Sequence, residues 1–113
     1  MEEYTANGAT IALGSKILAK LGKVEVRENH LGLFRENGDL IVSSPVSAIE
    51  VKKTLFYFAV PTIIILIDGQ KYRVNLSYQA SIEAGADDAV AKERQGEDNE
   101  VFFKAIRAAG GKA

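Results

Sequence analysis

The sequence predicts a mainly β (α+β) domain in which about seven short antiparallel strands form a barrel or sandwich and one C-terminal α-helix closes it. Three observations lead to this fold class. Several short segments between residues 9 and 76 alternate apolar and polar side chains, which is the period of a half-buried strand. Dipeptides that favour tight turns separate these segments. Near the C-terminus, the apolar residues take the spacing of an amphipathic helix instead.

Length and composition indicate one domain over residues 1–113. Hydrophobic residues make up 47% of the chain, which is enough for one core. There is no cysteine, which removes disulfides and thiolate metal sites and fits a reducing compartment. The first residues have neither the basic nor the apolar segment of a signal peptide, so we expect a cytoplasmic protein. The net charge of −1 excludes the strongly basic class of nucleic-acid-binding domains.

The first strand is expected at residues 10–13, and the segment that follows, residues 14–22, leaves two structures open. Ile17, Leu18 and Leu21 have the spacing of a helical turn, although the same residues could continue a strand. We favour a short helix or an irregular turn.

Residues 23–76 are expected to form a meander of strands. Residues 23–27 alternate polar and apolar side chains, and residues 31–35 form the next strand after a turn. Asn37-Gly38 then predicts a type I′ hairpin turn, because both residues tolerate a positive φ.

The second half of the meander contains the strongest hairpin signal. Residues 46–48 and 49–52 alternate in opposite phase, which predicts two strand segments with a bulge or bend between them. Asp68-Gly69 then joins a β-branched run, residues 62–67, to the alternating residues 70–76. A dipeptide of this kind between two such runs predicts a hairpin.

The last part of the chain predicts a connection and a helix. Residues 79–96 are rich in small and acidic residues, which indicates an acidic, mobile connection with at most a weak helix over 86–94. A helix is expected over residues 98–110, capped by Asp98 or Asn99. A helix of about three turns is marginal alone, so its apolar face must dock on the open end of the barrel. The residues of that face have i, i+3, i+4, i+7 spacing: Phe102, Ala105, Ile106 and Ala109.

The order of these elements resembles the pleckstrin-homology-like (PH-like) superfold, and within it the small bacterial PH-like and GRAM-like domains. The resemblance rests on the Asn37-Gly38 and Asp68-Gly69 hairpins, the alternating strand 71–76 and the terminal helix. It implies an antiparallel PH-like barrel and a binding module for lipids, peptides or proteins rather than an enzyme. Many such domains that bind phosphoinositides carry a basic pattern across the first hairpin. Within the meander, Lys-x-Arg occurs only late, at residues 71–73, so the resemblance does not carry that lipid site over.

Two surface features are candidates for binding. The first is an apolar strip in which alternation fails: Leu55, Phe56, Tyr57, Phe58, Val60 and Pro61. One face of this strip can enter the core, and the other is covered within the chain or exposed as an interface. The second is a lysine cluster: Lys16, Lys20, Lys23, Lys52 and Lys53. These lysines would gather if residues 14–22 folded beside residues 51–53, and they could then contact an anionic membrane. Interspersed glutamates favour an ordinary solvated surface instead.

No residue pattern predicts catalysis, a metal site or a cofactor. His30 is the single histidine and is expected in an exposed turn, and the acidic residues after 86 lack the spacing of a calcium loop. The leading hypothesis is therefore a non-enzymatic binding or scaffolding module that acts through protein–protein contact or self-association as a homo-oligomer. The alternative is peripheral binding to anionic membrane lipid through the lysine cluster. We expect no nucleic-acid partner.

Overall fold

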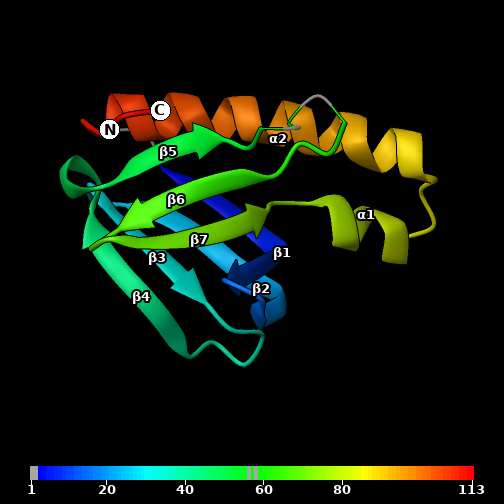
Figure 1. Ribbon diagram of the computed structural model, residues 1–113, viewed down its shortest axis with the longest axis horizontal. Helices are drawn as coiled ribbons and strands as arrows, with labels where there is room; N and C mark the ends of the chain where they lie inside the picture. The colour runs from blue at the N-terminus through cyan, green and yellow to red at the C-terminus, as the bar shows by residue number, and fades with distance from the viewer. Residues whose placement is uncertain (1–2, 56, 58) are drawn as a thin grey trace.

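The computed structural model describes residues 3–55, 57 and 59–113. In these ranges seven strands form one antiparallel sheet in the order β4-β3-β2-β1-β7-β6-β5, and two α-helices follow them (Figure 1). The strands are β1 (Tyr4–Leu13), β2 (Lys16–Arg27), β3 (His30–Phe34), β4 (Leu40–Pro45), β5 (Glu50–Lys53), β6 (Ile63–Ile67) and β7 (Gln70–Asn75). The helical elements are a 3-10 turn, η1 (Val46–Ala48), and the helices α1 (Tyr78–Glu83) and α2 (Asp88–Ala108). The predicted fold class, an antiparallel sheet with a C-terminal helix, is confirmed.

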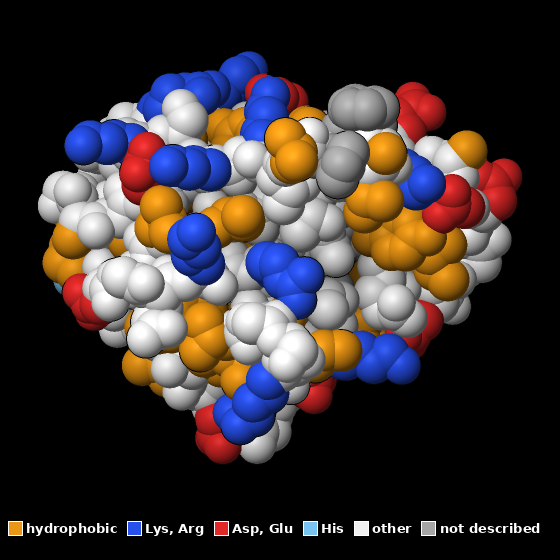
Figure 2. Space-filling model, in the orientation of Figure 1, with side chains coloured by type: hydrophobic (Ala, Val, Ile, Leu, Met, Phe, Trp, Pro, Cys, Tyr) orange, Lys and Arg blue, Asp and Glu red, His pale blue; other side chains and the backbone are white. Residues whose placement is uncertain are grey.

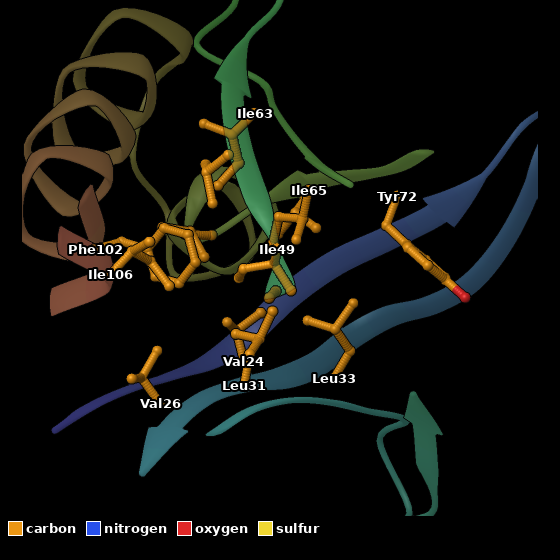
Figure 3. Packing of buried hydrophobic residues seen from close by; sticks show 14 of the residues in the cluster. Val24, Val26, Leu31, Leu33, Ile49, Ile63, Ile65, Tyr72, Phe102 and Ile106 are labelled. Carbon is orange, nitrogen blue, oxygen red and sulfur yellow. The ribbon is translucent and has the colours of Figure 1, made fainter. Parts of the chain in front are cut away.

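The core lies between the curved sheet and α2. Val24, Leu31 and Ile65 are fully buried and come from strands on both sides of the core (Figure 3). Phe102 and Ile106 of α2 reach the same cluster and are also fully buried (Figure 3). The predicted apolar face of the helix therefore packs on the barrel as expected.

Two of the hairpin turns use consecutive residues with positive φ. Asp68 and Gly69 have φ values of 49° and 77°, as the Asp-Gly prediction requires. Glu28 and Asn29 adopt φ values of 51° and 63° between β2 and β3. The Asn37-Gly38 hairpin exists, but its predicted type I′ turn is wrong. Only Gly38 of that pair has a positive φ, 91°, and its N–H donates to the carbonyl of residue 35 at 3.0 Å. The loop is thus longer than two residues.

Residues 16–22 belong to strand β2, so the strand alternative is confirmed and the favoured helix or irregular turn is wrong. β1 and β2 meet at a tight turn around Gly14, whose φ is 61°. Ile11 pairs with Ala19 but Ala12 pairs with Ile17, so the register shifts between them. Such a bulge places neighbouring residues on unexpected faces and breaks the strict alternation that identifies a strand. β1 itself begins at Tyr4, before the predicted start of the meander at residue 9.

Residues 46–48 form η1 and not a strand. The N–H of Val46 donates to the carbonyl of Asn29 at 2.9 Å, and Val46 itself is fully buried. The change of phase in the apolar–polar alternation between residues 46–48 and 49–52 therefore comes from the turn η1, which leads from β4 to β5.

The expected connection over residues 79–96 is mostly helical, and the predicted start of the last helix at residue 98 is wrong. α2 begins at Asp88 because the Asp87 carboxylate accepts a hydrogen bond from the Val90 N–H at 2.9 Å. A hydrogen bond from the Tyr78 hydroxyl, and a second contact with Lys92, hold the pKa of the Asp88 carboxyl below its usual value.

The buried stripe of α2 starts early, but its first members are small or polar and are not found by a search for apolar residues: Ala91, Gln95 and Asn99.

Two buried amides of α2 hold the long loop between β5 and β6. The side chains of Gln95 and Asn99 both donate to the carbonyl of Pro61, at 2.7 and 2.8 Å. Asn99 also donates to the Tyr57 hydroxyl at 3.1 Å, and Gln95 donates to Asn75 at 3.0 Å. Because both side chains are fully buried, these bonds offset part of the cost of placing polar groups in the core. They fix the base of the loop against the helix.

Two glycines should respond to alanine with opposite signs. At Gly22 a Cβ would lie 2.2 Å from the Phe34 carbonyl oxygen of the neighbouring strand, whereas at Gly96 in α2 it would meet nothing within 4 Å. We expect Gly22→Ala to lower the free energy of unfolding by about 2 kcal/mol or more. Gly96→Ala should raise it by about 1 kcal/mol, since alanine favours a helix. Urea denaturation measures both, and wild-type stability of Gly22→Ala would contradict the strand spacing.

The amide contacts of Asn99 should stabilise the fold. Asn99→Ala removes two hydrogen bonds and should lower the free energy of unfolding by about 1–3 kcal/mol. Val101→Ala, on the exposed side of the same helix, is the control and should change it by no more than about 0.5 kcal/mol. Equal stability of the two variants would show that the loop is held by other contacts.

Candidate binding surface

The outer face of β5, β6 and β7 carries cations at aligned positions. Lys52 lies opposite Ile64, and Ile64 lies opposite Arg73. Side chains alternate along a strand, so aligned residues share a face, and the inward neighbours Val51 and Ile65 are buried. Lys52 and Arg73 therefore stand on the outside, roughly 10 Å apart with Ile64 between them.

The next row on the same side continues this surface. Glu50 lies opposite Leu66, and Leu66 lies opposite Lys71. Lys52 is 3.9 Å from Glu50, whereas Lys71 has no carboxylate within salt-bridge distance in the described ranges. We call this surface the basic sheet face and define it by five residues: Lys52, Ile64, Leu66, Lys71 and Arg73.

A shallow hollow adjoins the hairpin between β1 and β2. It is lined by Gly14, Ser15, Ile64, Lys71 and Arg73. The Arg73 guanidinium donates to the Gly14 carbonyl and so ties the hairpin to β7. Arg73 also lies opposite Ala12 of β1, so the row that contains Lys52 and Ile64 continues onto a fourth strand. The hollow thus has an apolar floor with two cations beside it.

Charge is unevenly distributed over the molecule. On the side seen in Figure 2, lysine and arginine side chains spread over the centre and left, while most aspartates and glutamates lie toward the rim. Figure 1 shows in the same view that β5, β6 and β7 occupy this region. The net charge of −1 therefore conceals a locally basic surface.

The structure divides the lysine cluster predicted from the sequence. Lys16, Lys20 and Lys23 lie on β2, whereas Lys52 and Lys53 lie on β5. β2 pairs with β1 and β3, and the strands β1, β7 and β6 separate it from β5. The condition that would gather all five lysines, a first segment folded beside β5, is therefore not met.

The apolar strip predicted from the sequence lies in the loop between β5 and β6. Leu55 is 86% exposed and Val60 is 45% exposed, whereas Pro61 is buried and Tyr57 is half-buried. Phe56 and Phe58 lie outside the described residues. The strip is thus neither wholly core nor wholly surface, because its base packs inward and Leu55 points to solvent.

Sequence reasoning missed the basic sheet face, although part of its signal was present. The Asp68-Gly69 turn fixes the register of β6 and β7, and this register alone places Ile64 opposite Arg73. The positions of Lys52 and Ala12 depend on pairing between strands far apart in the chain. Local patterns do not specify those partners.

The groups considered for metal binding are His30 and the acidic side chains. His30 is exposed at the turn before β3, with its Nδ1 atom 3.2 Å from the Glu28 carbonyl oxygen. Across the ranges that the structure describes, no three His, Asp or Glu side chains gather as metal ligands. Neither helix in those ranges is both long and apolar enough to cross a membrane.

Comparisons with known proteins bear on the fold. No family model matches the sequence, and no curated protein matches it. Among solved structures, the chain is similar to the C-terminal PH domain of pleckstrin, which was crystallised in complex with D-myo-Ins(1,2,3,5,6)P5. The two share 15% sequence identity with a TM-score of 0.56, over 97% of this chain and 94% of that one. A closer relation to small bacterial or GRAM-like domains stays a prediction. With seven antiparallel strands closed by a C-terminal helix across its described residues, the chain has a pleckstrin-homology-like fold.

Proposed function

We propose that the protein is a non-enzymatic binding module that docks on anionic phospholipid membranes through the basic sheet face. The observation that carries this proposal is the row in which Lys52 and Arg73 flank Ile64, with Lys71 in the row beside it. Each cation near an anionic membrane contributes about 1 kcal/mol, so three together give a weak, reversible attachment.

Two further observations support an anionic ligand. Glu50, opposite Leu66, is the carboxylate aligned with the basic sheet face, whereas the face itself carries three cations. The pleckstrin domain with a similar fold was crystallised with an inositol phosphate. Phosphate groups are the ligands that lysine and arginine commonly bind.

The proposal places the protein at the cytoplasmic leaflet. That leaflet carries the anionic lipids that attract basic surfaces, and the attraction fades beyond about 8 Å at physiological salt. The predicted cytoplasmic location agrees with this placement and remains part of the proposal.

Removing two cations of the basic sheet face should weaken membrane binding. We expect Lys52→Gln/Lys71→Gln to lower the partition coefficient onto phosphatidylserine-containing vesicles by about 30-fold, since each lysine contributes about 1 kcal/mol. Lys16→Gln/Lys20→Gln removes the same charge from β2 and is the matched control. Vesicle co-sedimentation at low and high salt measures both. If the control pair weakens binding as much, net charge and not this face is responsible.

A second candidate function, protein–protein contact or self-association through the apolar strip, is favoured by the exposure of Leu55. Together with Val60 it exposes apolar surface of the kind that marks contact sites between proteins. Light scattering over a range of concentrations tests it. The membrane proposal expects a monomer at all of them, whereas a dimer that Leu55→Ser dissolves would favour the second candidate.

A further inference from the structure

We infer that the tip of the β5–β6 loop inserts into the bilayer when the basic sheet face docks. The loop then makes an apolar contact with the membrane interior, and the basic sheet face makes an electrostatic contact with the headgroups. The inference rests on the proposed function and deepens it by naming the residues that enter the membrane. We call these residues the loop tip: Leu55, Ala59 and Val60.

The loop tip presents apolar surface to solvent. Leu55 is 86% exposed and Val60 is 45% exposed, and Ala59 between them along the loop is exposed too. Transfer of a leucine side chain from water to hydrocarbon favours the bound state by about tenfold or more. While the loop tip stays in water, this free energy of transfer is not gained.

The loop tip is displayed on a fixed base. The Thr54 N–H donates to the Thr62 carbonyl at 3.2 Å, which closes the loop, and the Tyr57 N–H donates to the Thr54 carbonyl at 3.2 Å. The two buried amides of α2 hold the Pro61 carbonyl from below. Because the described ends of the loop are already held by these bonds, ordering them costs little on binding, which favours insertion.

Two lysines precede the loop tip at the end of β5: Lys52 lies on the side of the basic sheet face, and Lys53 on the opposite side of the strand, toward α2. Lys53 lies with its ammonium 4.9 Å from the centre of the Tyr57 ring and 3.8 Å from Glu100. Lys52 precedes it on β5 and belongs to the aligned row. Lysine side chains reach headgroup phosphates with the ammonium while their methylene stems stay near apolar surface. The loop tip and the cations therefore suit a surface that is anionic outside and apolar beneath.

This charge pattern favours a bilayer over a second copy of the chain. A two-fold contact centred on the loop tip would bring Lys52 and Lys53 of both copies near one another. Like charges at an interface oppose association. An anionic membrane instead attracts the same lysines. The charges beside the loop tip therefore favour contact with an anionic lipid surface over contact with a second copy of the chain.

Site-specific fluorescence tests the inference, because the chain has no cysteine of its own. Leu55→Cys carrying a polarity-sensitive dye should shift its emission to the blue on addition of phosphatidylserine vesicles. Leu40→Cys, a 54% exposed leucine on the strand at the other edge of the sheet, is the matched control and should not shift. Leu55→Ser should lower vesicle partitioning by about tenfold with an unchanged melting temperature, while Leu40→Ser should leave both unchanged.

The outcomes separate the two proposals. If wild-type protein binds vesicles but the dye at residue 55 stays in water and Leu55→Ser binds normally, the inference is wrong and the proposed function stands. If wild-type protein fails to bind anionic vesicles, both are wrong. If Leu55→Ser dissolves a dimer and leaves vesicle binding intact, the loop tip is a protein contact, and insertion is overturned.

Discussion

The packing of α2 against the curved sheet is the contact on which the rest of the structure depends. Phe102 is fully buried there, and its ring lies 5.3 Å from that of Tyr4 in an edge-to-face arrangement. The same helix face carries Gln95 and Asn99, which hold the Pro61 carbonyl. One helix therefore completes the core and positions the loop between β5 and β6. After the helix, the carbonyl of Lys112 accepts a hydrogen bond from the Val51 N–H at 2.8 Å, which covers part of the β5 edge.

The candidate surface follows from strand alternation. Each strand that buries one set of side chains must display the other, and the register then decides which displayed residues become neighbours. In β5, β6 and β7 the buried set is apolar, and the displayed set brings Lys52, Ile64 and Arg73 into one row. A chain with a net charge of −1 can therefore present a basic surface without any basic run in its sequence.

Much of the fold could be predicted from local patterns, and the failures have physical causes. Asp68-Gly69 was sufficient to predict a hairpin, and the apolar stripe around Phe102 was sufficient to predict a C-terminal helix. Both predictions succeed because turn geometry and helix period are local properties of the chain. The early turns of α2 were missed since their inward residues, such as Gln95, gain burial through hydrogen bonds and not through apolar character. Residues 14–22 were misjudged because β-bulges break the alternation that marks a strand.

The candidate site was only partly accessible to the same reasoning. The failed alternation after Lys53 identified the loop, but not that Leu55 points to solvent while Pro61 is buried. The basic sheet face depends on pairing of β1 with β7 and of β5 with β6, whose partners are separated along the chain. The five lysines singled out from the sequence would gather only if residues 14–22 folded beside residues 51–53, and the sheet order separates them onto two strands.

Amide NMR spectra of the protein on anionic bicelles that contain a spin-labelled lipid test the central claim most directly. The account predicts that the spin label broadens the signals of Lys52, Ile64 and Arg73 and leaves those of β4 sharp. Broadening confined to β3 and β4, or none at all with bicelles in excess, would contradict docking through the basic sheet face.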